Sequence, residues 1–170
     1  MSYAPFKIRI YAFLLDYLVI VLYGIFVVGA ISFVFRSHFT PLFSSSPVTA
    51  ELTGFIMMTF PVSLYFILGE CSKWQGTFGK RKVGIRVVDK VGQRIGFGRS
   101  ALRTAIKFLP WEVAHFGMWQ LMLPSDWSEN TVYMILTAVN LVIVFYLIIP
   151  FTNKKRKNVY DWLAGTEVVR

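Results

Sequence analysis

The chain has 170 residues, of which 55% are hydrophobic and 17% aromatic, and its mean hydropathy is +0.55. This composition excludes an ordinary soluble domain of that length and is typical of a small membrane protein with several spans. The net charge of +9 would suit nucleic-acid binding, but the basic residues cluster beside apolar segments, as in cytoplasmic loops of membrane proteins, so we expect no nucleic-acid partner.

An apolar run over residues 7–35 predicts a first membrane helix from about Pro5 to about Phe35, with its span at about residues 10–35. The run is longer than a signal-peptide core and contains Asp16, so we expect a retained anchor. A carboxylate near the bilayer centre costs about 2.5 kcal/mol or more, and it is usually paired or turned toward a polar interior. The Pro-, Ser- and Thr-rich residues 36–51 predict a loop.

A second apolar run predicts a span over residues 52–70, which Glu70 ends. Pro61 in its middle removes one backbone donor and should kink the helix, with neighbouring groups satisfying the freed carbonyl. The polar and basic residues 71–103 predict a cytoplasmic segment. Within it, KVGIRVVD and QRIGF on either side of a turn predict a short β-hairpin. Since an isolated hairpin is marginal, we expect the last residues, TEVVR, to supply a supporting strand.

Residues 99–123 return to a helical pattern, in which Arg99, Arg103 and Lys107 are four apart and share one face. The basic, amphipathic start of this helix is typical of a membrane surface. Glu112 and His115 lower the hydropathy of the rest, so two alternatives stay open: a third span over residues 104–123, or an interfacial helix. A last apolar span is predicted over residues 131–151, followed by a basic tail over residues 152–170.

Together these elements predict an all-α membrane protein, a single domain over residues 1–170 with four transmembrane helices and a short cytoplasmic β-hairpin. Basic segments belong on the cytoplasmic side of a membrane, and neutral or acidic loops on the other. Four spans with both termini in the cytoplasm satisfy every loop, whereas three spans would put one basic cluster outside. We expect a multi-pass protein of the cell membrane.

The sequence also predicts what the protein lacks. A single cysteine, Cys71, excludes an internal disulfide, and two scattered histidines argue against a dedicated transition-metal site. The segment GTFGKRK has neither the spacing nor the Ser or Thr of a phosphate-binding loop, and its glycines are interpreted as a turn near the lipid headgroups. With no catalytic triad or carboxylate dyad visible, we expect no enzyme and no metal or other cofactor.

Four blocks in order along the chain resemble the RDD family of small membrane proteins. They are a first helix that opens with Arg9 and carries Asp16, then TFGKRKVGIRVVD, GQRIGFGRSALR and DWLAGTEVV. The resemblance implies a multi-pass membrane protein for which transport is the usual suggestion, and cation/proton antiport has been attributed to some members. It also implies that Asp161, rather than Asp89, is the second family aspartate.

Two positions depart from the pattern of that family. Pro is often found in the place of Phe78, and His in the place of Tyr160. If that histidine is a proton carrier in other family members, this protein has to do without it.

The geometry of the first helix separates Arg9 from Asp16. Seven residues place the two side chains within about 20° on one face but roughly 10 Å apart along the axis, and helical side chains lean toward the N-terminus. We therefore expect each to pair with another segment. The candidates are Arg103 or Lys107 for Asp16, and Glu70 or Asp161 for Arg9.

The first functional hypothesis is a small secondary transporter that exchanges a monovalent cation for protons. Asp16 would be the protonatable cation site and Arg9 would tune it. Glu112 and His115, three residues apart on one face, would continue a proton path, and Asn140 would offer a neutral oxygen. Because four helices enclose little interior, we expect a homo-oligomer. The alternative for Asp16 and Arg9 is a structural pair that fixes helix packing.

The second functional hypothesis is a membrane adaptor or lipid-binding module that does not transport. Basic side chains near a membrane surface attract anionic lipids by about 1 kcal/mol each. The predicted lipid contacts lie in the cytoplasmic segment and are Lys80, Arg81, Lys82 and Arg99.

Overall fold

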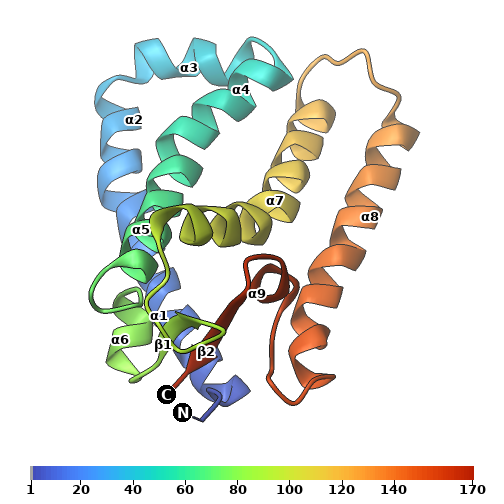
Figure 1. The fold of residues 1–170 in the computed structure, drawn as a ribbon. Helices are drawn as coiled ribbons and strands as arrows, with labels where there is room; N and C mark the ends of the chain where they lie inside the picture. The colour runs from blue at the N-terminus through green and yellow to red at the C-terminus, as the bar shows by residue number, and fades with distance from the viewer. Residues whose placement is uncertain (1) are drawn as a thin grey trace. The chain divides into compact units, whose positions relative to one another are not determined.

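The computed structural model describes residues 2–170, which are mostly helical (Figure 1). They form two compact units, each built from segments that are distant in the sequence. The first unit contains the chain up to Val21 together with Val62–Lys107 and Phe145–Arg170. The second unit contains Leu22–Pro61 and Phe108–Val144.

The first predicted membrane helix is confirmed as a helical stretch. Helix α1 (Phe6–Tyr23) continues through a π-helical turn, η1 (Gly24–Gly29), into α2 (Ala30–Val34). The 29 residues Phe6–Val34 are long and apolar enough to cross a membrane. Most of their large apolar side chains, such as Phe13, Phe26 and Phe33, are exposed, as suits a surface that faces lipid.

The predicted loop over residues 36–51 is wrong, because most of that segment is helical. Helix α3 (Arg36–Ser44) lies across the ends of α2 and α4 (Pro47–Gly54) (Figure 1). Ser46 caps α4, since its hydroxyl accepts a hydrogen bond from the Thr49 amide at 3.2 Å, and Pro47 occupies the first helical position. Ser and Pro in this order are a helix-start signal.

The second predicted span is confirmed in outline, and a neighbouring group satisfies the carbonyl that Pro61 leaves free, as expected. Helix α4 continues through η2 (Phe55–Thr59) into α5 (Phe60–Cys71), and Pro47–Cys71 is a candidate span. Pro61 cannot donate to the carbonyl of Met57, four residues earlier. The Tyr23 hydroxyl donates to that carbonyl instead, at 2.9 Å. A neighbouring side chain therefore satisfies the group that the proline leaves free.

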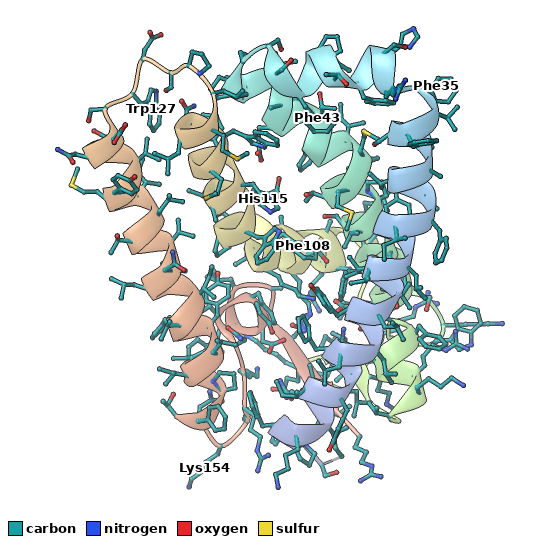
Figure 2. The ribbon with its side chains drawn as sticks, turned by 180° about the vertical axis from the view of Figure 1, so that it is seen from behind. Phe35, Phe43, Phe108, His115, Trp127 and Lys154 are labelled. Atoms are coloured by element: carbon teal, nitrogen blue, oxygen red, sulfur yellow. The ribbon has the colours of Figure 1, made fainter. Side chains whose placement is uncertain are left out.

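Two further long helices follow. Helix α7 (Phe97–Met122) contains Pro110 and is too polar to count as a candidate span, whereas Glu129–Phe151, made of α8 (Glu129–Ile148) and η3 (Ile149–Phe151), is one. In the described residues three helices are thus long and apolar enough to cross a membrane. The fourth span, over residues 104–123, stays a prediction. Lys154 projects from the turn that follows α8 (Figure 2).

The predicted β-hairpin is present only in part, whereas the supporting strand predicted from the last residues is confirmed. Strand β1 (Arg86–Asp89) pairs antiparallel with β2 (Thr166–Val169), in a register that places Val87 opposite Val168. The segment QRIGF contributes one isolated bridge, from Arg94 to Val88. All four residues of β2 are buried, so the C-terminal strand removes apolar surface from water as well as pairing.

The sheet lies at the apolar core of the first unit. Val87 and Val168 pack with buried residues from the segment before α1, from α1 itself and from the loops that flank β1, which are Ala4, Ala12, Ile85 and Ile95. Two short helices, α6 (Phe78–Lys82) and α9 (Val159–Leu163), belong to the same unit. The C-terminal residues are therefore part of the folded core.

Acidic pH is expected to loosen the end of this sheet at Glu167. Burial opposes ionisation of Glu167, but Lys157 and Lys155, at 2.9 and 3.1 Å, outweigh that effect and hold its pKa below the ordinary value of 4.5. A carboxyl whose pKa is lowered by folding stabilises the protein above its unfolded-state pKa, and that contribution disappears as pH falls through the folded-state pKa.

We therefore expect wild type to have a higher Tm than Glu167→Gln at neutral pH, and the difference to shrink below about pH 4.5. Thermal denaturation of both proteins across that range measures it. A difference that stays constant with pH would contradict the role of this ion pair.

Candidate functional site

Asp16 is the centre of a buried set of hydrogen bonds in the first unit. Its carboxylate, on α1, is 1% exposed. It accepts hydrogen bonds from the Tyr65 hydroxyl at 2.6 Å, the Thr77 hydroxyl at 2.5 Å and the Gly79 amide at 2.7 Å. An ionised carboxylate only accepts hydrogen bonds, so three donors suit it. We call these four residues the Asp16 clamp; it ties α1 to α5 and α6.

Gly79 is the residue that lets α6 approach α1. A Cβ atom at this position would lie 2.1 Å from the Ala12 carbonyl oxygen and 2.9 Å from the Asp16 Cγ atom. Such distances are well inside van der Waals contact. The interpretation of this glycine as a turn near the headgroups is therefore wrong, because its lack of a side chain permits a buried helix contact.

Gly79→Ala is expected to lower stability by about 1–3 kcal/mol or more, because the atom it would strike belongs to helix backbone. Gly98→Ala is the matched control, since nothing lies within 4 Å of a Cβ at Gly98 and alanine is the better helix former. Thermal unfolding in detergent measures both. Equal Tm values for the two variants would show that the close approach at Gly79 is unimportant.

Glu70, at the end of α5, holds two cations. The Lys80 ammonium lies 3.0 Å from its Oε1 atom, and the Arg103 Nε atom lies 3.1 Å from its Oε2 atom. All three side chains are buried. The prediction that Lys80 contacts lipid is therefore wrong, because the Lys80 side chain is only 9% exposed and forms an ion pair with Glu70.

Asp161 joins Arg103 to Arg9. Its carboxylate lies 3.0 Å from Arg103 Nη1 and 3.7 Å from Arg9 Nη1, and it caps α9 by accepting from the Asn158 amide at 2.9 Å. The predicted pairing of Arg9 with Asp161 is confirmed, while Arg103 pairs with Glu70 and Asp161 instead of Asp16. Arg9 also donates to the Arg156 carbonyl at 2.8 Å, which ties α1 to the C-terminal segment.

Tyr160 occupies the position where the family pattern often has histidine. Burial raises the pKa of its phenol to about 12, so the side chain stays neutral at physiological pH. Its ring lies 4.8 Å from the Arg103 guanidinium carbon, a cation–π distance. Burial opposes the charge of Arg103, but Asp161 and Glu70 raise its pKa overall. Tyr160 therefore packs as a neutral side chain against the Arg103 cation.

The Asp16 clamp and these ion pairs form one continuous arrangement, because the Lys80 ammonium also lies 3.5 Å from the Thr77 hydroxyl. We call the five ion-paired residues the charge network: Arg9, Glu70, Lys80, Arg103 and Asp161. They come from α1, α5, α6, α7 and α9. Lys107, the other predicted partner of Asp16, lies with its ammonium 3.4 Å from the Phe66 ring centre.

The three other residues that the sequence predicts as lipid contacts are exposed on the first unit. Arg81 stacks on Trp74, with 4.2 Å between the guanidinium carbon and the ring centre, and Lys82 lies 5.6 Å from the Phe78 ring centre. Arg99 makes an exposed ion pair with Asp89 at 3.4 Å. These basic residues are accessible and do not belong to the charge network.

A second polar cluster lies in the second unit. On α7, Glu112 accepts a hydrogen bond from the Thr59 hydroxyl at 2.8 Å and lies 3.9 Å from His115 Nδ1. Glu51 of α4 interacts electrostatically with Glu112. The predicted proximity of Glu112 and His115 is confirmed. Glu51 is a residue that the sequence analysis assigned to a loop.

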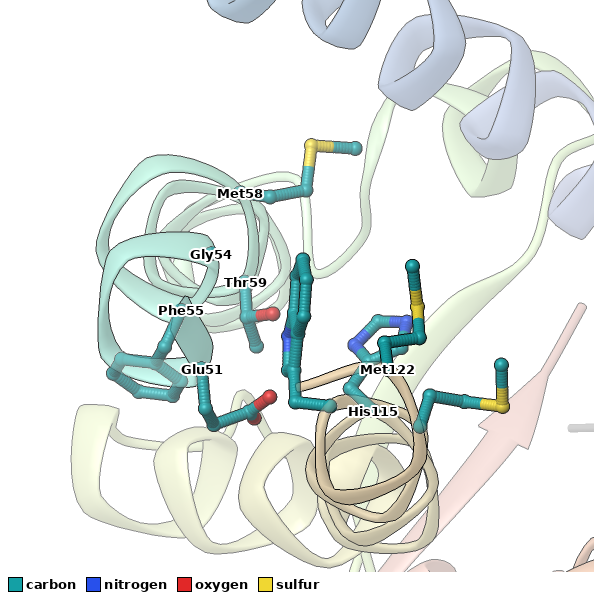
Figure 3. A pocket seen from close by; sticks show the side chains of 9 residues that line it. Glu51, Gly54, Phe55, Met58, Thr59, His115 and Met122 are labelled. Carbon is teal, nitrogen blue, oxygen red and sulfur yellow. The ribbon is translucent and has the colours of Figure 1, made fainter. Parts of the chain in front are cut away.

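This cluster borders a pocket of about 200 Å³. The Glu51 carboxylate and the Thr59 hydroxyl point toward the pocket from α4 and η2, and His115 and Met122 line it from α7 (Figure 3). Asn140 also belongs to the second unit, but it is exposed on α8 and donates to the carbonyl of Leu136 at 2.7 Å. It lines no part of this pocket.

The model of the RDD family matches residues 3–165, nearly the whole chain. The chain belongs to the RDD family. It is thereby a membrane protein, as its three apolar helices also indicate. A comparison with curated proteins and one with solved structures give no match.

In this RDD protein, the blocks that carried the resemblance supply the buried polar groups of the first unit. The first helix contributes Arg9 and Asp16, the TFGKRKVGIRVVD block contributes Thr77, Gly79 and Lys80, and the last block contributes Asp161. Tyr65 was missed because a tyrosine in an apolar run gives no signal of a buried hydrogen bond. Glu51 and Thr59 were missed because their partners are distant in the sequence.

Proposed function

We propose that this RDD protein is a small secondary transporter of the cell membrane, with four spans and both termini in the cytoplasm, that exchanges a monovalent cation for a proton. The observation that supports it best is that Glu51 lines a pocket and interacts electrostatically with Glu112. Two carboxyl groups can share a hydrogen bond only when one of them carries a proton. A cation that enters the pocket can take the place of that proton.

We assign the proton exchange to this pair and a positioning role to Asp16. Asp16 already accepts three hydrogen bonds inside a packed contact, and Gly79 leaves no space beside it. Glu51 and His115, in contrast, both line the pocket. The Asp16 clamp and the charge network then hold the helices in place while the second unit carries the exchange.

The same arrangement favours transport over catalysis. Intramembrane ionisable groups most often mark ion paths. Because a chain of this size encloses little interior, we expect the working form to be a homo-oligomer.

Proton flux in proteoliposomes tests this function. An outward gradient of Na⁺, K⁺ or an organic ammonium ion is applied, and a trapped pH dye reports proton movement. We expect flux in wild type and in Asp16→Asn, loss of flux in Glu112→Gln and Glu51→Gln, and normal flux in the exposed control Glu129→Gln. Absence of flux under every gradient would overturn the proposal, as would full flux in the Glu112→Gln variant.

A second candidate function is binding of anionic lipid, and one observation favours it. Around α6 the cations Arg81 and Lys82 are exposed beside the aromatic rings of Trp74 and Phe78, a combination suited to a headgroup region. Thermal stabilisation by phosphatidylglycerol over phosphatidylcholine, reduced in an Arg81→Gln, Lys82→Gln double variant, would support it. Equal stabilisation by both lipids would exclude it.

A further inference from the structure

The pocket of the second unit has walls of mixed chemistry. One side offers polar groups, Glu51 and Thr59, with Glu112 bonded behind Thr59. The remaining side chains are mainly large, polarisable and apolar: Phe55, Met58, Met118, Trp119 and Met122. The Trp119 ring is fixed by stacking on Phe43, with 5.9 Å between the ring centres. The walls therefore combine negative charge with an aromatic face and thioethers.

The charge around the pocket is negative. The titratable groups that line it are Glu51 from α4 and His115 from α7, and Glu112 lies next to His115. No Lys or Arg is among the nine residues that line it. With the carboxyl group of Glu51 in its wall, the pocket favours a positively charged guest.

The size and the walls select the kind of cation. A volume of about 200 Å³ is several times the roughly 30 Å³ that one water takes in the liquid, so a bare ion would leave most of it empty. Na⁺ and K⁺ prefer a shell of oxygen ligands, as hard cations do, and few oxygens are present. Aromatic faces and thioethers instead suit an alkylated ammonium group, which gains cation–π attraction and dispersion contacts.

We propose that this pocket binds a small organic ammonium ion with an apolar body, held between the carboxylate of Glu51 and the indole of Trp119. The proposal rests on the proposed proton exchange and names the class of cation exchanged. The charge balances in this exchange. Before the ion binds, Glu51 and Glu112 together hold one proton and carry a net charge of −1. When the ammonium ion binds, the proton leaves to water, and two carboxylates with one cation again carry −1.

Binding of benzyltrimethylammonium to the purified protein in detergent tests this assignment. The ion keeps its charge at every pH, and its neutral carbon isostere, neopentylbenzene, controls for apolar binding. We expect saturable quenching of tryptophan fluorescence and a rise in Tm with the ammonium ion, neither with the isostere, and tighter binding as pH rises. Isothermal calorimetry in two buffers of different ionisation enthalpy should detect release of up to one proton for each ion bound.

Two variants and a matched control locate the site. We expect Glu51→Gln to weaken binding at least tenfold, and Trp119→Leu to weaken it by about 2- to 30-fold, the range of a lost cation–π contact. Trp162→Leu removes an exposed indole of the first unit and should leave binding unchanged. Equal binding of the isostere, or unchanged affinity in both pocket variants, would overturn the assignment.

The outcomes also separate this inference from the function on which it rests. Suppose that Na⁺ or K⁺ drives a proton flux that depends on Glu112, and that the ammonium ion does not bind. This result would overturn the assignment of an organic cation but would still support antiport. Binding of the ammonium ion with proton release, but with no flux in proteoliposomes, would overturn transport and leave the pocket assignment standing.

Discussion

Glu70→Gln is expected to destabilise the protein by about 3 kcal/mol or more, because removing one partner of a buried ion pair leaves a buried charge uncompensated. Each carboxylate oxygen of Glu70 accepts from a different cation, Lys80 at 3.0 Å and Arg103 at 3.1 Å. A glutamine has one acceptor oxygen, so its amide group would turn two hydrogens toward one of the two cations.

Thermal unfolding in detergent, followed by loss of the monodisperse peak in size-exclusion chromatography, measures the effect. Asp126→Asn is the control, because it removes a carboxylate that is exposed, and it should leave Tm nearly unchanged. Similar Tm values for Glu70→Gln and wild type would mean that the charge network does not hold α5, α6 and α7 together.

Asp16→Ala is the second change with a large expected effect. It leaves the hydroxyls of Tyr65 and Thr77 and the amide of Gly79 without their acceptor. A buried donor left unsatisfied costs about 1–3 kcal/mol, so the loss is on the order of 3 kcal/mol or more. Asp16→Asn should cost far less, because its carbonyl oxygen can still accept while its amide donates to the Thr77 hydroxyl, which has lone pairs available.

The comparison between these two variants separates structure from chemistry. If Asp16 only positions the helices, the asparagine variant is nearly as stable as wild type and keeps its proton flux, while the alanine variant unfolds at a lower temperature. A stable asparagine variant without flux would instead make Asp16 a proton-exchanging group, as the sequence first suggested.

The long apolar helices and the family could be predicted from the sequence, because each leaves a local signal. Hydropathy over residues 7–35 and 131–151 predicts α1, α2 and α8, and the ordered motif blocks predict the RDD family. The freed carbonyl could be predicted from Pro61, because a proline lacks the N–H that would bond to the carbonyl four residues earlier in the same helix. The hydroxyl that donates to this carbonyl belongs to Tyr23. It could not be predicted, because it depends on how the helices pack.

Other elements were mispredicted because their signals depend on context. Residues 36–51 resemble a loop in composition, yet Ser46 and Pro47 begin a helix. The hairpin is reduced to one bridge because β1 pairs along its whole length with β2, whose four residues are buried. Lys80 seemed one of several surface cations, and only its contact with Glu70 distinguishes it from Arg81.

The polar groups of the protein therefore divide into two sets with different roles. The Asp16 clamp and the charge network are tightly paired within the first unit, and we expect changes there to appear mainly as lost stability. Glu51 and Glu112 lie beside open volume in the second unit, and we expect changes there to appear mainly as lost exchange.

Infrared difference spectroscopy of the carboxyl groups tests the shared proton of Glu51 and Glu112 most directly. As pH is raised, we predict that wild type loses the carbonyl band of one protonated carboxyl group for each chain. That band should be absent from Glu51→Gln and Glu112→Gln and unchanged in Asp16→Asn. A band that persists in both glutamate variants and disappears in Asp16→Asn would contradict the assignment and return the exchangeable proton to Asp16.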